Sequence, residues 1–264
     1  MVTLFITHSY GFFSCCSMRL HQIINYFNQT KQLPENVDST KQFTWYKPEG
    51  VNADITHEYF NKNIEDSLKI HFNSFIDYHQ AYQFINYKLI DYVNLIPLIK
   101  KYFSPSTQIL NDIKNIETKY NLLEKYNNIC VIFYRGNDKA TETTLCSYDD
   151  IICQSKNYLD KNPGTQFLVQ SDETEFIERA LKEFPDSIVF NDEIRHMSRN
   201  PKRTVDWDVK NNILEFSKYY LAITIIMSKC KYIICGSGNC SIWIMFYRGN
   251  ANNICQFLNG KWIV

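Results

Sequence analysis

The chain has 264 residues and a mass of 31.3 kDa, enough for one large domain or two small ones. Hydrophobic residues make up 45% of it and charged residues 21%, a balance that is typical of a globular protein and excludes a disordered or collagen-like one. Because 28 Lys and Arg balance 28 Asp and Glu, the molecule has no overall field that would hold nucleic acid or an anionic membrane. We therefore expect no nucleic-acid partner, and any ligand has to be held by a local site.

The first half of the chain has an irregular pattern. Residues 2–7 (VTLFIT) are β-branched and aromatic, which predicts a buried strand, and a turn at Gly11 leads into an amphipathic stretch over 18–27 that predicts a helix. Residues 30–53 are polar and contain two Pro, which predicts loops. Apolar residues with helical spacing predict further helices over 64–75, 82–102 and 107–125.

The pattern changes near residue 120, after which short apolar runs alternate with amphipathic stretches. The runs predict strands over 129–134 (ICVIFY), 165–170 (TQFLVQ), 188–190 and 232–235 (YIIC). The stretches between and after them predict helices over 148–160, 173–184, 209–230 and 242–248. Strands that alternate with helices in this way are typical of an α/β domain with a parallel sheet.

Three features indicate a protein of the cytoplasm. The longest near-continuous apolar run, 219–227, is far shorter than the roughly 20 residues of a membrane helix, so we expect no membrane span. The first ten residues lack the basic and apolar regions of a secretory signal. The nine Cys are odd in number and spread along the chain, which favours buried free thiols over a disulfide framework.

In a parallel sheet, ligands bind beyond the carboxyl ends of the strands. The predicted strand ends are 8–17, 135–144, 171–173 and 236–241, and all four are rich in polar or small residues. This convergence is the strongest indication of a functional site that the residues themselves provide.

The first and third strand ends each have two interpretations. His8, Gly11 and Ser14 could line a pocket, or they could form the turn and cap of the helix that follows. Asp172 could contact a ligand, or the segment 171–173 could cap the next helix with favourable acids.

The second strand end places Arg135, Asp138, Lys139 and Glu142 within eight residues after a buried strand. An Arg suits bidentate recognition of phosphate, and a nearby Lys adds a point charge. Glu142 is a candidate general base. An ion-pair network in a solvated loop is the structural alternative.

The fourth strand end, GSGNCS, is a turn of small residues. Its candidate ligand contacts are Ser237, Gly238, Asn239 and Ser241, because backbone N–H groups of such a turn can face a phosphate at a helix N-terminus. Tight-turn packing is the alternative. The phosphate-binding motifs GxxxxGK[ST] and GxGxxG are both absent.

Together these motifs resemble the donor half of the GT-B fucosyltransferase superfamily, which includes α1,6- and α1,2-fucosyltransferases, nodulation fucosyltransferases and protein O-fucosyltransferases. The family motif H-x-R-R-x-D-K corresponds to FYRGNDK over 133–139. The segments 167–185 (FLVQSDETEFIERALKEFP) and 227–243 (MSKCKYIICGSGNCSIW) follow in the family's order and spacing. The resemblance covers about residues 125–250, and the segment 11–27 is similar to viral and environmental members.

The resemblance implies a GT-B-like α/β fold in which two Rossmann-like domains face a cleft and the N-terminal one is irregular. Residues 1–122 would form the acceptor-side domain and 123–264 the domain that binds the nucleotide-sugar donor. The implied reaction is an inverting transfer of fucose from GDP-fucose to a hydroxyl of a glycan acceptor, without a metal cofactor, by a cytoplasmic enzyme of the viral or bacterial type.

The resemblance also implies roles for individual residues. Catalytic roles fall on Arg135, which would stabilise the leaving diphosphate, on Asp138, and on Glu142, which lies one position out of register with the family's proposed base. The residues implied at the donor are Arg135, Lys139, Asp172, Ser237, Gly238, Asn239 and Ser241. His8, Gly11 and Ser14 are expected on the acceptor side.

The motif departs from the family at three places. Phe133 stands where the family has His, and Gly136 stands where it has a second Arg. Many members carry an acid that reads the guanine in the helix before the last strand, where this chain has Ala222-Ile223-Thr224. The donor base would then have to be held differently, by Asp192 or His196.

Two other functions are open. Asp206-Trp207-Asp208 is a D-x-D sequence, which in metal-dependent glycosyltransferases holds Mn²⁺ under the diphosphate. Helix capping by Asp206 or Asp208 is the favoured explanation, because the acids follow a basic loop and precede a helix. A catalytically degenerate relative that only binds a sugar or a protein is the other alternative. Retention of Arg135, Glu142 and Ser241 favours an active enzyme.

Cysteine offers a further interpretation, because Cys230, Cys235 and Cys240 recur at intervals of five. A zinc site would need a second tight Cys or His pair, and none completes it. We interpret these residues as buried small apolar side chains.

Overall fold

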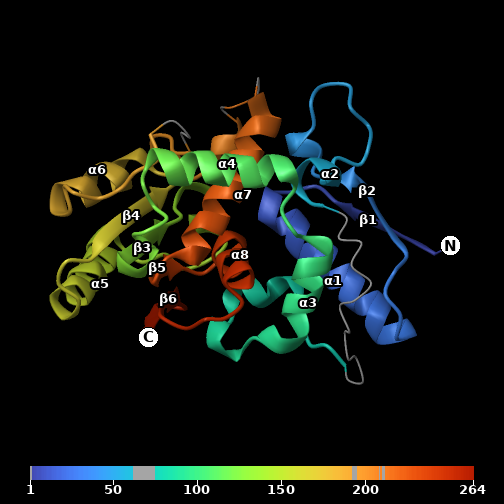
Figure 1. The fold of residues 1–264 in the computed structure, drawn as a ribbon, viewed down its shortest axis with the longest axis horizontal. Helices are drawn as coiled ribbons and strands as arrows, with labels where there is room; N and C mark the ends of the chain where they lie inside the picture. The colour runs from blue at the N-terminus through green and yellow to red at the C-terminus, as the bar shows by residue number, and fades with distance from the viewer. Residues whose placement is uncertain (1, 62–74, 192–194, 208, 210–211) are drawn as a thin grey trace.

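The structure is a computed structural model that describes residues 2–61, 75–191, 195–207, 209 and 212–264. The helix predicted over 64–75, and the residues Asp192 and Asp208, therefore lie outside the described residues, apart from Phe75 at the end of that helix. Figure 1 shows the two ends of the molecule, with the N-terminal elements on one side and the larger sheet on the other.

The N-terminal half begins with a parallel strand pair joined by a helix. These elements are β1 (Thr3–His8), α1 (Phe12–Thr30) and β2 (Asn36–Gln42). The strand expected over 2–7 is confirmed, but its expected burial is wrong, because only Ile6 of β1 is buried and Phe5 is 71% exposed. The helix α1 starts six residues before the expected position because Phe12 and Phe13 already face the core. The loops expected over 30–53 are wrong for β2, a polar strand whose backbone pairs with β1.

The rest of this half consists of short helices. They are η1 (Thr44–Tyr46), α2 (Thr56–Tyr59), η2 (Gln80–Phe84), η3 (Tyr87–Leu89), α3 (Tyr92–Tyr102) and α4 (Thr107–Lys119). The single helix expected over 82–102 is wrong, because His79, Asn86 and Asp91 each cap a separate turn with their side chains and so divide the segment. The helix expected over 107–125 ends at Lys119, just before Asn121 adopts a left-handed φ of 51°.

The C-terminal half contains a five-stranded sheet, and the expected parallel α/β architecture is confirmed. Its strands are β3 (Ile129–Tyr134), β4 (Gln166–Ser171), β5 (Tyr232–Gly236), β6 (Ile254–Leu258) and β7 (Lys261–Ile263), in the spatial order β4-β3-β5-β6-β7. All neighbours are parallel except β7, which is antiparallel to β6. Residues 188–190 form only a bridge from Ile188 to Leu168, and the sequence pattern does not predict β6 and β7.

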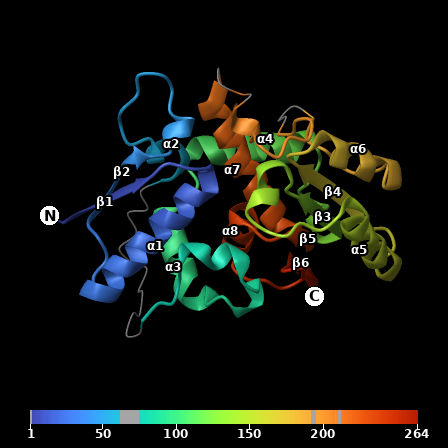
Figure 2. The same cartoon turned by 180° about the vertical axis from the view of Figure 1, so that it is seen from behind.

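Helices cover both faces of this sheet. They are α5 (Tyr148–Lys161), α6 (Thr174–Glu183), α7 (Ile213–Lys229) and α8 (Asn239–Arg248), with short 3-10 turns η4 (Tyr126–Asn128), η5 (Asn137–Thr141) and η6 (Val205–Trp207). One hydrophobic cluster packs α5 and α6 against the sheet. A larger cluster packs α7 and α8 against the sheet and against the N-terminal half, so these two helices lie between the halves (Figures 1 and 2).

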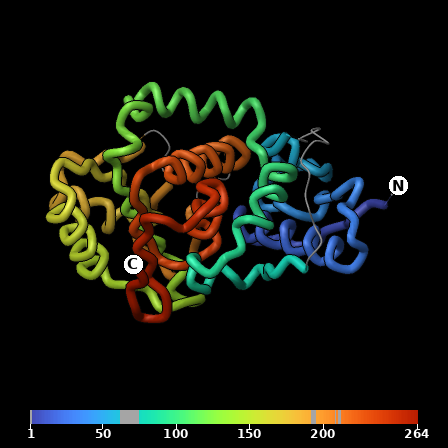
Figure 3. Tube along the Cα trace, turned by 60° about the horizontal axis from the view of Figure 1, so that its bottom comes forward, coloured from blue at the N-terminus to red at the C-terminus, as the bar shows by residue number. Residues whose placement is uncertain are grey.

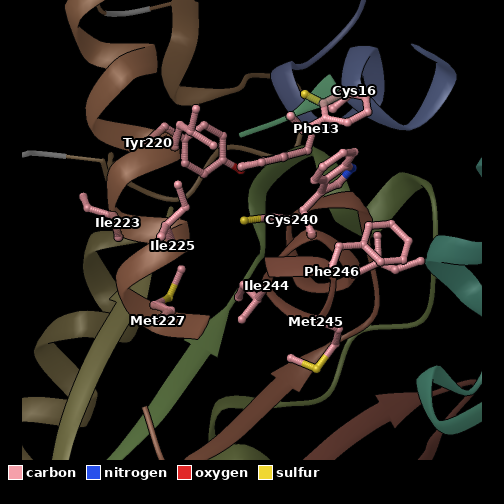
Figure 4. Packing of buried hydrophobic residues seen from close by; sticks show 14 of the residues in the cluster. Phe13, Cys16, Tyr220, Ile223, Ile225, Met227, Cys240, Ile244, Met245 and Phe246 are labelled. Carbon is pink, nitrogen blue, oxygen red and sulfur yellow. The ribbon is translucent and has the colours of Figure 1, made fainter. Parts of the chain in front are cut away.

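A continuous apolar core thus joins the two halves. Trp243 of α8 is fully buried, lies 4.7 Å from Phe103 between ring centroids, and donates its indole N–H to Ser17 Oγ of α1 at 2.9 Å. Labelled side chains of α1, α7 and α8 converge in this core (Figure 4), and α4 runs across the linking region (Figure 3). The division into domains 1–122 and 123–264 stays a prediction.

Two expectations about the whole chain concern its helices and its thiols. Within the described ranges, no helix combines the length and the apolar character needed to cross a membrane. All nine Cys are free and all but Cys153 are buried, as predicted.

Candidate active site

The sheet topology marks one position for a ligand. From β3 the chain moves outward to β4 on one side and later returns to β5 on the other side. In open α/β sheets such a reversal leaves a crevice at the carboxyl ends of the two diverging strands. Arg135 follows β3 and Ser237 follows β5, so both lie at this crevice.

A cavity of about 480 Å³ opens at this position and is bounded by both halves of the molecule. The predicted site residues that line it are His8, Gly11, Ser14, Arg135, Asp138, Lys139, Glu142, Ser237, Gly238, Asn239 and Ser241. The cavity is also lined by residues that no sequence pattern indicated, which include Tyr10, Trp45, Gln80, Gln83, Thr204 and Tyr220. Of the predicted set, Asp172 does not line the cavity.

Arg135 is held in place by three neighbours. Its Nε lies 3.0 Å from Asp172 Oδ2, and its two terminal nitrogens lie 3.1 Å from Tyr220 Oη and 3.3 Å from Asp138 Oδ1. Burial alone would lower the pKa of Arg135, but Asp172, Tyr220 and Asp138 together raise it well above its ordinary value. The guanidinium is therefore permanently charged, preorganised and in contact with the cavity.

Asp172 and Glu173 hold the loop after β3 from behind. Gly136 N donates to Asp172 Oδ1 at 2.8 Å, and Asn137 N donates to Glu173 Oε1 at 2.7 Å. The Asn137 side chain donates to the carbonyl of Asp172 at 2.7 Å, and its backbone takes a left-handed φ of 42°. Asp172 thus positions Arg135 and its loop instead of facing the cavity.

Gly136 has no space for a side chain. A Cβ at this position would lie 2.2 Å from the buried carboxylate of Glu173. The same carboxylate accepts hydrogen bonds from Asn137 N and from Tyr148 Oη, so it cannot move aside without losing them. Position 136 therefore has no room for the second Arg of the motif H-x-R-R-x-D-K.

We expect Gly136→Ala to lower the free energy of unfolding by about 1–3 kcal/mol, because the added methyl group overpacks this site. Urea unfolding measures the loss. Gly236→Ala is the matched control, since a Cβ there meets nothing within 4 Å. Equal stability of the two variants would contradict the steric explanation.

Lys139 brings a second cation to the cavity beside the start of α8. It is buried, its Nζ pairs with Glu142 Oε2, and it lies 5.7 Å from the centre of the Phe84 ring. A Cβ on Gly238 would lie 3.0 Å from Lys139 Cε, so the glycine makes room for the lysine. α8 has no side-chain N-cap, and its positive end therefore adds to the field of Lys139.

The side chains of the turn before α8 are mostly used to hold the fold. Ser237 Oγ donates to the carbonyl of Phe257 at 2.7 Å, and Asn239 Oδ1 accepts from Ser17 Oγ at 2.8 Å. Gly238 N donates to the hydroxyl of Tyr87 at 2.9 Å. The turn therefore has a defined shape before a ligand arrives.

Three groups could accept a proton in the cavity. Glu142 has a side chain that is 42% exposed and pairs with Lys139. Burial raises the pKa of Asp138, and Arg135 opposes that shift. Burial lowers the pKa of His8, which favours the neutral imidazole, and its Nε2 lies 2.9 Å from Ser14 Oγ.

Two lining residues, Thr204 and Asp206, have buried polar atoms without a hydrogen-bond partner, Thr204 Oγ1 and Asp206 Oδ1. Arg195 Nη1 is buried and unpartnered as well, but Arg195 does not line the cavity. The sequence does not indicate Arg195 as a site residue, since no motif surrounds it. His196, expected to help hold the base, does not line the cavity and pairs through Nδ1 with Thr174 Oγ1 at 2.9 Å.

Aromatic side chains border the side of the cavity that residues from the N-terminal half form. Tyr10 is 59% exposed and Trp45 is 41% exposed, and their ring centroids are 6.3 Å apart. His8 lies 4.8 Å from the Tyr10 ring. Exposed rings at the wall of a cavity offer apolar faces to a ligand that also carries polar groups.

Among the described residues, no group of three or more His, Cys, Asp or Glu side chains could hold a metal ion. Asp206 lines the cavity, whereas Asp208 lies outside the described residues. Trp207 is 57% exposed and does not line the cavity.

Comparison with known proteins gives partial structural similarity. No protein-family model matches the chain, and no curated protein matches it. The chain is similar to NodZ α-1,6-fucosyltransferase co-crystallised with GDP, with 12% identity, a TM-score of 0.43, and coverage of 63% of this chain and 49% of that one. It is also similar to NodZ soaked with GDP-fucose, with 12% identity, a TM-score of 0.43, and coverage of 66% of this chain and 52% of that one. For POFUT1 in complex with GDP-fucose the identity is 13%, the TM-score is 0.35, and the coverage is 62% of this chain and 49% of that one. The chain spans about half the length of these proteins.

Proposed function

We propose that the chain is a glycosyltransferase that moves fucose from GDP-fucose to a glycan hydroxyl, with inversion and without a metal. The observation that carries the proposal is the position of Arg135. It is a preorganised guanidinium at the switch point of a parallel sheet, in a cavity that also contains Lys139 and the start of α8. Fucose and guanine are proposed from the motif over 133–139, which resembles that of the fucosyltransferases.

The proposed chemistry is a single displacement. The acceptor oxygen attacks the anomeric carbon while the bond from that carbon to the diphosphate oxygen breaks, and negative charge develops on the leaving diphosphate. Arg135 and Lys139 stabilise this charge, assisted by the turn at 236–241. Glu142 takes the proton of the acceptor hydroxyl, and Asp138 is the second candidate for this role.

The acceptor is proposed to bind to the side of the cavity formed by residues 1–122, and the donor to the side formed by 123–264. His8, Gly11 and Ser14 belong to the acceptor side, together with the exposed rings of Tyr10 and Trp45. Stacking of sugar rings on these aromatic faces, with hydrogen bonds to neighbouring polar groups, suits a glycan.

We further propose that the enzyme acts in the cytoplasm and is of the viral or bacterial type. Its nine free Cys suit a reducing compartment. The segment 11–27, which forms most of α1, is similar to viral members of the superfamily.

A thermal-shift titration with GDP, UDP, GDP-fucose and UDP-sugars, with and without Mn²⁺, tests the proposal. A ligand at 100 times its Kd stabilises the folded protein by about 2.7 kcal/mol. We expect GDP and GDP-fucose to stabilise the protein in the absence of metal. Equal stabilisation by all diphosphates would remove the argument for guanine, and no stabilisation by any nucleotide would favour a relative that only binds sugar or protein.

A metal-dependent glycosyltransferase is the second candidate, and the unpartnered Oδ1 of Asp206 at the cavity is the observation that favours it. In that case Asp206 and Asp208 would hold Mn²⁺ under a donor diphosphate. Stabilisation only by UDP-sugars together with Mn²⁺ would identify this function.

We expect Glu142→Gln to lower kcat about 10²- to 10⁴-fold, because the amide cannot take the acceptor proton. Donor affinity should not weaken, since Lys139 then loses its partner and is free to bind phosphate. Steady-state kinetics and GDP calorimetry measure the two effects. Glu124→Gln, on the exposed surface, is the control. Unchanged turnover in Glu142→Gln would move the role of base to Asp138.

A further inference from the structure

Arg195 is a buried cation with an unused donor. Its side chain belongs to a residue that is 9% exposed, and its Nη1 has no hydrogen-bond partner. Arg135 and Lys139 each pair with a carboxylate, whereas no ion pair joins Arg195 to a carboxylate within the described part of the chain. A charge buried in this way is costly unless an anion compensates it.

Tyr220 connects this cation to Arg135. The guanidinium carbon of Arg195 lies 3.3 Å from the centre of the Tyr220 ring, and 4.1 Å from that of Phe216. The hydroxyl of the same Tyr220 accepts from Arg135 Nη1 at 3.1 Å, and Tyr220 lines the cavity. One tyrosine, which reaches from α7 toward α1 and α8 in Figure 4, therefore holds two arginines through its face and its edge.

The segment that carries Arg195 is attached to the loop of Arg135. Met197 N donates to the carbonyl of Asp172 at 3.1 Å, and Thr174 N donates to the carbonyl of Met197 at 2.9 Å. Asn200 N donates to Asn137 Oδ1 at 2.7 Å. These bonds dock the segment on the carboxyl end of β4, beside the motif 133–139.

Arg195 does not itself line the cavity, but it lies directly behind a residue that does, Tyr220. Burial lowers the pKa of Arg195, the charge of Arg135 lowers it further, and Tyr220, Asp206 and Tyr46 raise it. Tyr220, Asp206 and Tyr46 all line the cavity. Two cations that repel each other across one ring favour the binding of an anion close to both.

We propose that Arg195 is a further cation of the diphosphate site, beside Arg135 and Lys139, and supplies the charge that Gly136 has no room to carry. The proposal rests on the proposed function and deepens it. Arg135, which lines the cavity, would donate to phosphate oxygens of a nucleoside diphosphate, and Arg195 would add its charge from directly behind Tyr220. A planar guanidinium stacks on the Tyr220 ring in a way that an ammonium group cannot.

Calorimetric titration of the whole chain with GDP, inorganic pyrophosphate and guanosine tests the proposal. Arg195→Met should weaken GDP and pyrophosphate binding about 10- to 100-fold and leave guanosine binding unchanged. The affinity of Arg195→Lys for GDP should lie between those of the wild type and Arg195→Met, because lysine keeps the charge but loses the planar group that stacks on the Tyr220 ring. Without ligand, Arg195→Met should unfold at a urea concentration close to that of the wild type, because it removes a buried charge that forms no ion pair but also loses the contacts with the rings of Tyr220 and Phe216.

Arg248→Met is the matched control, since Arg248 donates to the carbonyls of Cys230 and Lys231 away from the cavity. It should keep full GDP affinity. If Arg195→Met binds GDP as tightly as the wild type does, this inference is overturned and the proposed function still stands. Equal losses of affinity for GDP and for guanosine would also overturn the inference, because they would show that Arg195 supports only the fold. A wild-type chain that binds neither GDP nor pyrophosphate would overturn both.

Discussion

Arg135→Ala should lower kcat about 10²- to 10³-fold, which is the usual effect of removing one preorganised group that stabilises developing charge. The reason lies in its three contacts, with Asp172, Asp138 and Tyr220, which fix the guanidinium before the donor binds. Released GDP, measured with GDP-fucose and a panel of glycan acceptors, reports the rate. Arg135→Lys should recover only part of it, since one ammonium group cannot keep all three contacts and still bind phosphate.

Two controls separate this effect from a loss of structure. Arg179→Ala removes an arginine that forms exposed ion pairs on α6, with Asp149 and Glu183, and should keep full activity. The thermal midpoint of Arg135→Ala shows whether the unpaired Asp172 has disturbed the fold. A folded Arg135→Ala protein with wild-type turnover would exclude the proposed role of Arg135.

Trp243→Ala should lower the free energy of unfolding by about 3–5 kcal/mol, as is usual when a fully buried aromatic side chain is truncated. Its indole packs with Phe103 of the N-terminal half and Phe246 of its own helix, and its N–H donates to Ser17. The mutation leaves a cavity where the two halves meet. Urea unfolding, followed by far-UV circular dichroism and by fluorescence, measures the change.

Trp243→Phe should lower the free energy of unfolding by less, because phenylalanine keeps an aromatic ring at this position. Trp45→Ala should change the free energy of unfolding little, because Trp45 is 41% exposed. A loss near zero for Trp243→Ala would show that the halves do not depend on this contact. Two separate unfolding transitions in the wild type would instead support independent domains over 1–122 and 123–264.

Much of the C-terminal half could be predicted from the sequence. The apolar run 129–134 is too continuous for a half-exposed strand, and all of its residues are buried in β3. The polar loop that follows a buried strand has to emerge at the edge of the sheet, so the sequence pattern alone predicts that Arg135, Asp138, Lys139 and Glu142 share a site. Local pattern and chain order are sufficient there.

Local pattern failed where contacts between distant segments decide the structure. β2 is polar and is a strand only because its backbone pairs with β1. Asp172 was a candidate ligand contact because it follows a strand end, yet its carboxylate accepts a hydrogen bond from Gly136 N and holds the loop. Nothing in the sequence around Arg195 sets it apart.

The sequence by itself determined the α/β class and the charged loop after β3, since both depend on neighbouring residues along the chain. Only the tertiary structure decided that Glu173 fills the space beside Gly136, and that Arg195 lies on Tyr220 next to Arg135. These features depend on which side chains the packing of α7 and the docking of 195–200 bring together, and that packing involves residues far apart in the chain.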